Sequence, residues 1–150
     1  MPSGAQKKEF EPAWWLPGGH IQTLYRKFSP IETVRQVRQR IELKDGDFID
    51  LDWAENIAVV DNTTGMIVVI LHGLCGCAGS SYVLSLQRLL SENGIPSVAM
   101  NFRGCSGEVN RKAQAYHSGV SEDVEEVFSS LSHLHPEKNF AFVGYSLGGN

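Results

Sequence analysis

The sequence has no long hydrophobic run, few cysteines and no cluster of basic charge. Its longest apolar stretch, Met66 to Leu71, is far too short to cross a bilayer, and residues 1–12 lack the apolar centre of a secretory signal. The 13 basic and 17 acidic residues are interspersed, which disfavours a nucleic-acid or membrane-surface partner. Three cysteines, an odd number, do not suit a secreted disulfide framework. These absences predict a cytoplasmic protein without a transmembrane segment.

What is present is an ordinary globular composition. The chain has 150 residues, about one domain, and is 42% hydrophobic and 20% charged, which is too apolar for a disordered chain. Residues 1–35 are interpreted as an irregular N-terminal arm, and residues 36–150 as the main domain.

The main domain begins with a pattern typical of a β-hairpin. Ile41 and Leu43 alternate with polar residues, Asp45-Gly46 supplies a turn, and the alternation resumes through Leu51 and Trp53. This pattern predicts two half-buried antiparallel strands.

After the hairpin the pattern changes to alternating strands and helices. Met66 to Leu71 is a continuous β-branched run, typical of a strand buried on both faces. Further strands are predicted over 95–100 and 140–145. A helix is predicted from about Ser80, with Tyr82, Val83, Leu86, Leu89 and Leu90 at helical spacing, and a second with Val120, Val124, Val127, Phe128 and Leu131 on one face. The fold class is therefore α/β, a mostly parallel doubly wound sheet.

The strongest chemical signal is the segment Gly144-Tyr145-Ser146-Leu147-Gly148. It matches the G-x-S-x-G nucleophile elbow and follows a predicted buried strand, as that motif requires. A sharp strand-to-helix turn projects the Ser146 hydroxyl clear of the sheet, and Gly144 and Gly148 leave room for the turn. Ser146 is thus the candidate nucleophile.

Two further loops follow predicted strands at the same edge of the sheet. In His72-Gly73-Leu74 the backbone N–H of Leu74 is the candidate oxyanion donor, together with the N–H of Leu147. His72 and Gly73 support the loop, His72 through a hydrogen bond rather than proton transfer. In the glycine-rich loop over 101–107, we favour a bracing role for Arg103 over direct substrate contact.

Taken together, these segments resemble the YheT-type branch of the α/β-hydrolase superfamily, which includes the ABHD1/ABHD3-like proteins. The matching segments cover nearly the whole chain and are His20-Ile21-Gln22-Thr23, Asp45-Gly46-Asp47-Phe48, Asp52-Trp53, His72-Gly73-Leu74, 101–108, Tyr116-His117-Ser118-Gly119 and 144–150. The resemblance implies hydrolysis of carboxylic esters, short-chain or acylglycerol, through an acyl-enzyme on Ser146. It implies a small-molecule ester or lipid-like substrate, no cofactor and no metal.

In this fold the acid and the histidine of the triad follow the serine along the chain. Only residues 147–150 follow Ser146, so we expect a fragment of a longer protein, inactive alone. The upstream histidines are poor substitutes for the missing base; they are His20, His72, His117, His133 and His135.

Three other interpretations are open. Gly73, Gly76 and Gly79 lie between a strand and a helix, but their spacing departs from the dinucleotide-binding pattern. A metal or redox site could form from Cys75, Cys77 and Cys105 with His72, although Cys-x-Cys is tighter than the usual zinc spacing. A non-catalytic binding protein on a hydrolase scaffold is the third, because fold alone does not exclude it.

Overall fold

The computed structural model describes residues 11, 13–28, 34–55, 65–113 and 121–150. The chain divides into two units, residues 1–30 and residues 31–150. The first unit contains helix α1 (Gly19–Phe28), so the prediction of a wholly irregular arm was wrong. The helical spacing of Ile21, Leu24 and Tyr25 gives this segment an apolar stripe that the surrounding Trp, Pro and Gly residues obscured.

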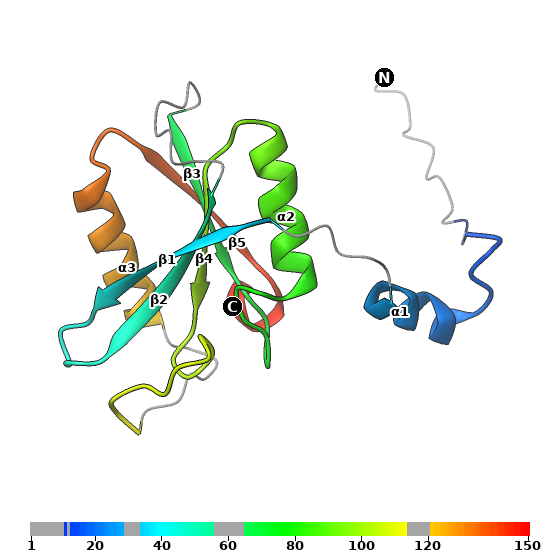
Figure 1. Ribbon diagram of the computed structural model, residues 1–150, viewed down its shortest axis with the longest axis horizontal. Coiled ribbons are helices and arrows are strands. Elements are labelled where there is room, and N and C mark those ends of the chain that lie inside the picture. The colour runs from blue at the N-terminus through cyan, green and yellow to red at the C-terminus, as the bar shows by residue number, and fades with distance from the viewer. Residues whose placement is uncertain (1–10, 12, 29–33, 56–64, 114–120) are drawn as a thin grey trace, which may run out of the picture. The chain divides into compact units, whose positions relative to one another are not determined.

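Five strands of the second unit form one mixed sheet in the order β1-β2-β4-β3-β5 (Figure 1). In chain order the elements are β1 (Gln36–Glu42), β2 (Phe48–Ala54), β3 (Met66–Leu71), α2 (Ser81–Glu92), β4 (Ser97–Asn101), α3 (Ser121–Leu134), β5 (Asn139–Gly144) and the 3₁₀ turn η2 (Ser146–Gly149). Strands β3, β4 and β5 are parallel to one another, and β2 is antiparallel to both of its neighbours, β1 and β4. The predicted α/β class, with its antiparallel hairpin, is confirmed.

The hairpin forms in the predicted place. Ile41 lies opposite Ile49, and the turn between the strands has Gly46 at φ +87°, a conformation that glycine adopts without strain. The N–H of Leu43 donates to the carbonyl of Asp47 across the turn, at 2.9 Å.

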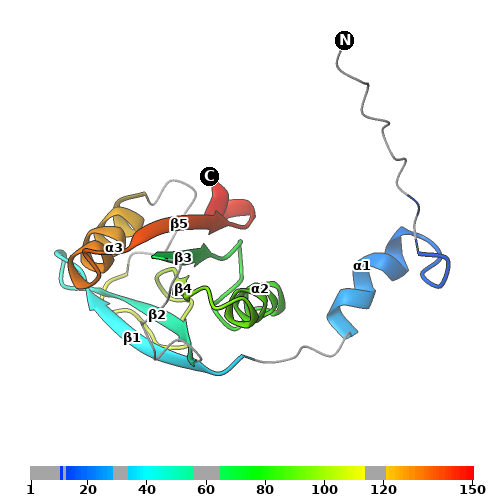
Figure 2. The same cartoon turned by 90° about the horizontal axis from the view of Figure 1, so that it is seen from above.

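Strand β3, which lies between β4 and β5, is buried on both faces because helices cover both sides of the sheet (Figure 2). Val68 and Ile70 pack with α2 on one face, while Val69 and Leu71 pack with α3 on the other. Burial of an aliphatic side chain of this kind stabilises the fold by about 1.5–3 kcal/mol relative to leaving it exposed. A continuous apolar strand is therefore stable at this interior position of the sheet.

The two helices follow the predicted faces with two differences. Val83 of α2 and Leu131 of α3 are fully buried, but Leu89 and Phe128 are substantially exposed. Val120, predicted on the second helix, lies outside the described residues. Across the part of the chain that the structure describes, no helix is long and apolar enough to span a bilayer.

The parallel pairing of β3 with β4 and β5 brings the carboxyl ends of three strands to one edge. The ladder between β3 and β5 extends one residue further, since the N–H of Tyr145 donates to the carbonyl of Leu71 at 3.0 Å. The loops that follow these strands, which begin near His72 and Ser146, therefore lie side by side at this edge of the sheet.

Candidate active site

Ser146 is the first residue of η2, at the sharp turn that follows β5. Its φ is +52°, a left-handed conformation that costs a non-glycine residue on the order of 1–3 kcal/mol. The residue is exposed, at the edge where β5 ends. Among the described residues, the only other non-glycine residue with positive φ is Cys75, at +57°, in the loop that follows β3. Backbone strain at non-glycine residues thus falls on two of the three loops that the sequence singled out.

Gly144 and Gly148 allow this turn because neither position has room for a side chain. A Cβ atom at Gly144 would overlap the backbone of Gly148. A Cβ atom at Gly148 would lie 2.6 Å from the carbonyl oxygen of Leu71 and 2.7 Å from that of His72. The elbow is therefore pressed against the end of β3, and that close approach sets the position of Ser146.

The loop after β3 lies directly against the elbow. A Cβ atom at Gly73 would lie 3.1 Å from the carbonyl oxygen of Tyr145 and 3.4 Å from the Cβ of Ser146. Leu74 follows, with its side chain exposed. Neither the N–H of Leu74 nor that of Leu147 has a hydrogen-bond acceptor among the residues that the structure describes. Leu147 directly follows Ser146 and Leu74 directly follows Gly73, so both N–H groups stay candidate oxyanion donors.

His72 is buried between the loops that follow β3 and β4. Its Nδ1 lies 2.8 Å from the carbonyl oxygen of Gly73, and its Nε2 accepts a hydrogen bond from the N–H of Phe102 at 3.2 Å. The hydrogen bonds place the ring proton on Nδ1, and burial lowers the pKa of the imidazole. The geometry is that of a neutral histidine that joins two loops.

Two other described histidines of the sheet unit lie far from Ser146. His133 and His135 lie at the end of α3, where β5 begins, so the whole length of β5 separates them from the elbow. His20 belongs to the other unit, and His117 lies outside the described residues.

Arg103 is almost fully buried and joins three segments. Its guanidinium makes a bidentate pair with Asp123 of α3 at 2.7 and 2.8 Å, and it contacts Asp45 and Asp47 of the hairpin turn at 2.7 and 3.1 Å. The hydrogen bond with Asp123 raises the pKa of Arg103 above its ordinary value, against the effect of burial. All these partners are carboxylates of the protein, so the contacts of Arg103 hold α3 and the hairpin turn together.

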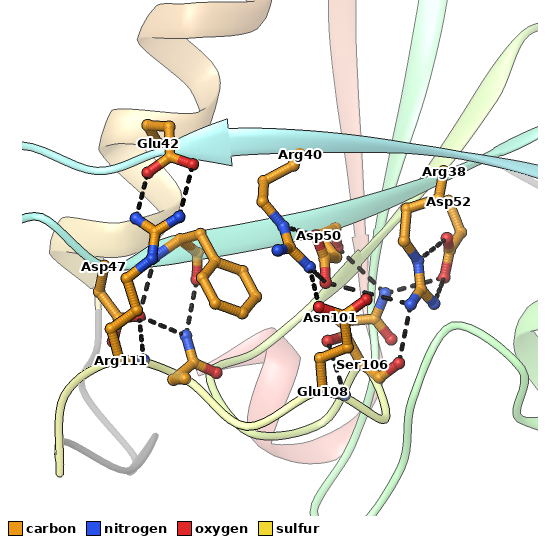
Figure 3. A network of polar contacts seen from close by, with 12 residues as sticks. Arg38, Arg40, Glu42, Asp47, Asp50, Asp52, Asn101, Ser106, Glu108 and Arg111 are labelled. Atoms are coloured by element: carbon orange, nitrogen blue, oxygen red, sulfur yellow. Dashed lines mark hydrogen bonds and ion pairs between the residues drawn. The ribbon is translucent and has the colours of Figure 1, made fainter.

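Sequence reasoning missed a polar network that holds the loop after β4 (Figure 3). Arg38 and Arg40 of β1 make bidentate pairs with Asp52 and Asp50 of β2, at 2.7–2.9 Å. The same guanidinium groups reach the loop, Arg38 at the carbonyl of Ser106 and Arg40 at the carboxylate of Glu108. Burial raises the pKa of Asp50, but the hydrogen bonds outweigh it and the pKa is lowered overall.

Asn101 extends this network to the loop after β3. Its Nδ2 donates to the carbonyl of Asp50 at 3.0 Å and to the Asp52 carboxylate at 2.9 Å, while its Oδ1 accepts from the N–H of Ala78 at 2.8 Å. Asn101 thereby links the hairpin to the loop that carries the candidate oxyanion donor Leu74. The Arg-x-Arg and Asp-x-Asp patterns were a sequence signal for this network.

No group of three or more His, Cys, Asp or Glu side chains in the described ranges is placed to hold a metal ion. Cys75 is exposed, Cys77 and Cys105 are half-buried, and none of the three forms a disulfide. The Cys₃His arrangement considered from the sequence is not assembled.

A sequence model of the alpha/beta hydrolase fold family matches residues 67–150, which is more than half of the chain. The chain belongs to this family. Among curated α/β-hydrolase relatives, "Putative esterase YheT" of Escherichia coli (strain K12) is 40% identical over 147 residues, 95% of this chain and 42% of that protein. "Phospholipase ABHD3" of Homo sapiens is 33% identical over 144 residues, 93% of this chain and 35% of that protein. The predicted resemblance to the YheT-type branch is confirmed.

Solved structures of hydrolases show the same fold. The Pyrococcus furiosus esterase Pf2001 matches with a TM-score of 0.60 and 20% identity, over 77% of this chain and 43% of that one. XC6422 from Xanthomonas campestris, described as an a/b serine hydrolase without lid, matches with a TM-score of 0.58 and 21% identity, over 80% of this chain and 55% of that one. The chain spans less than half the length of these two curated relatives.

Proposed function

We propose that the protein is a serine hydrolase that cleaves carboxylic esters through an acyl-enzyme on Ser146. The observation that carries the proposal is the left-handed φ of Ser146 between two glycines that admit no side chain. Such strain persists only where the surrounding structure enforces it, and it presents the hydroxyl at the carboxyl edge of the sheet.

In the proposed first step, the Ser146 oxygen attacks the ester carbonyl carbon and its proton passes to a histidine. The carbonyl oxygen becomes an oxyanion, which the N–H groups of Leu74 and Leu147 bind. When the tetrahedral intermediate collapses, the bond to the alcohol breaks and the histidine returns the proton to the leaving alcohol. Water then attacks the acyl-enzyme by the same sequence and releases the acid and Ser146.

The histidine and its acid belong to the whole protein in this proposal. The described histidines of the sheet unit are either committed to loop hydrogen bonds, as His72 is, or lie at the far end of β5. We therefore expect the 150-residue chain alone to bind substrate-like probes poorly and to lack turnover. The absence of disulfides among its cysteines fits the proposed cytoplasmic location.

The proposed substrate is a small-molecule ester, short-chain or of acylglycerol type. Two names support an ester substrate, the esterase name of the Escherichia coli relative and the phospholipase name of the human one. The proposed chemistry uses protein groups and water, so no cofactor is part of the proposal.

A fluorophosphonate probe tests the proposal because it labels only an activated serine. We expect the whole protein to be labelled and Ser146→Ala to lose all labelling. Ser129→Ala, which removes an exposed hydroxyl on α3, is the matched control and should label like the wild type. Equal labelling of Ser146→Ala and wild type would exclude Ser146 as the nucleophile. No labelling of a folded whole protein would favour a non-catalytic binding role.

A further inference from the structure

Tyr82 of α2 contacts the loop that carries the candidate oxyanion donor Leu74. Its Oη accepts a hydrogen bond from the N–H of Gly73 at 3.0 Å. A Cβ atom at Gly76 would lie only 2.5 Å from this oxygen, so the hydroxyl fits beneath the loop because position 76 is glycine. The loop itself closes with a hydrogen bond from the N–H of Gly76 to the carbonyl of Gly73, at 3.0 Å.

The ring of Tyr82 also contacts the nucleophile elbow. Its centroid lies 4.7 Å from that of Tyr145, with the two planes tilted by 55°. Tyr145 immediately precedes Ser146, and its carbonyl accepts a hydrogen bond from the N–H of Gly148 at 3.0 Å. One side chain on α2 thus contacts both segments that supply the proposed oxyanion donors.

We propose that Tyr82 is a positioning residue that fixes the N–H groups of the two oxyanion donors, Leu74 and Leu147, relative to each other. This inference rests on the proposed function. The Tyr82 hydroxyl occupies the Gly73 N–H and so fixes the peptide that precedes Leu74. The contact of its ring with Tyr145 fixes the elbow against the same point. Oxyanion donors are effective only when they are preorganised. A small rotation of either segment therefore reduces the stabilisation of the transition state more than it reduces the affinity for substrate.

Tyr82→Phe separates these two contacts, since it removes the acceptor of the Gly73 N–H and keeps the ring against Tyr145. In the whole protein we expect kcat per active site, titrated with a fluorophosphonate, to fall about 10- to 100-fold, with KM changed by less than about 3-fold. Binding of a trifluoromethyl ketone, whose hemiketal oxygen occupies the oxyanion position, should weaken in parallel with kcat. Tyr82→Leu, which also loses the ring contact, should reduce kcat further.

Ser85→Ala is the matched control, because it removes from the same helix a hydroxyl that donates within that helix, to the carbonyl of Ser81. It should leave kcat and ketone binding unchanged. A merely structural role for Tyr82 would lower the number of titratable sites and leave kcat per site intact, and that result would overturn the inference.

Two further outcomes keep the two proposals apart. If Ser146→Ala abolishes labelling but Tyr82→Phe matches the wild type in kcat per site, the function stands and the role of Tyr82 falls. If Tyr82→Phe does not fold, a ring-fluorinated tyrosine at position 82 keeps the shape and weakens the acceptor oxygen. Unchanged kcat per site in that protein would equally overturn the inference.

Discussion

Ser146 and Cys75 share a left-handed backbone conformation, and each does so beside a glycine-dependent contact. The elbow of Ser146 is pressed against the end of β3 at Gly148, and the loop of Cys75 wraps the Tyr82 hydroxyl at Gly76. A close contact at a glycine therefore accompanies strain in both loops, with backbone carbonyls at Gly148 and with a side-chain hydroxyl at Gly76. Because the neighbours of the elbow are backbone atoms, a side chain added at Gly148 should act on the serine directly.

Gly148→Ala is expected to displace the elbow. The added Cβ has the carbonyl oxygens of Leu71 and His72 within 2.7 Å, so the turn must move away from β3. We expect a loss of about 1–3 kcal/mol in the free energy of unfolding and at least a roughly 100-fold slower fluorophosphonate labelling. Urea unfolding and labelling rates measure the two effects.

Gly19→Ala is the control for that experiment, because a Cβ there meets nothing within 4 Å. It should leave labelling unchanged. Normal labelling of Gly148→Ala would contradict the role assigned to the close contact.

His72 predicts a pH dependence of stability. Burial lowers the pKa of the folded imidazole below the unfolded value of about 6.5, so the unfolded chain binds more protons. Stability is therefore full above about pH 6.5 and is lost as the pH falls toward the folded pKa. Urea unfolding between pH 7.5 and 5 should show this slope, and His72→Asn should reduce it. An unchanged slope in His72→Asn would show that another group titrates.

The sequence could place single residues of the site but not their contacts. The elbow motif marks Ser146, Gly144 and Gly148 because local backbone geometry demands those residue types. The assignments of Leu74 and Leu147 as oxyanion donors stay predictions. The contact of Tyr82 with Gly73 depends on how α2 packs against the sheet, which no local pattern determines.

At the scale of elements, buried Arg103 ties the start of α3 to the hairpin turn. Asp123→Ala removes its bidentate partner and leaves Arg103 with Asp45 and Asp47. Breaking a buried ion pair lowers the free energy of unfolding by about 3–5 kcal/mol. Because two carboxylates still pair with Arg103, we expect a loss of about 3 kcal/mol in this variant. Urea unfolding should show that loss.

Glu92→Ala is the comparison, since it breaks the exposed pair of Arg88 and Glu92 within α2. Surface pairs contribute about 0–1 kcal/mol, so this variant should unfold close to the wild type. Equal stability of the two variants would mean that Arg103 does not act as a brace.

Most elements were predictable because their patterns are local. Alternation and the Asp45-Gly46 turn predict the hairpin, and taking that turn as its centre also places Arg38 opposite Asp52 and Arg40 opposite Asp50. Helix α1 was missed because its stripe is short and stands among loop-forming residues. The exposure of Leu89 could not be predicted, because the width of the buried face depends on the tertiary packing of α2.

For the whole molecule, three carboxylates with lowered pKa values, Glu42, Asp45 and Asp47, predict a second loss of stability at low pH. Hydrogen bonds from Arg103 and Arg111 lower the pKa of Asp45 and Glu42, and hydrogen bonds from Asn110 and nearby backbone lower that of Asp47 despite its burial. These carboxylates stabilise the fold above their unfolded pKa values of about 4, and their contribution is lost as the pH falls below them.

Unfolding free energies measured from pH 6 to pH 3 should therefore drop most steeply below about pH 4.5. Asp47→Asn should flatten that drop, because one of the depressed groups no longer titrates. Glu92→Gln, on the surface of α2, should leave the profile close to that of the wild type. A wild-type profile without this drop would contradict the stabilising role of these carboxylates.

The strand order has a consequence for when the strained turn at Ser146 can form. The hairpin can pair as soon as β2 is made, but β3 is completed only when β5, the last strand along the described chain, docks beside it. The elbow is pressed into shape by the end of β3, so its strained turn can form only after that docking. A nascent chain emerging from the ribosome would thus carry an ordinary, unreactive serine. The strained turn would arrive when β5 docks, and reactivity would follow only once the histidine of the proposed mechanism is in place.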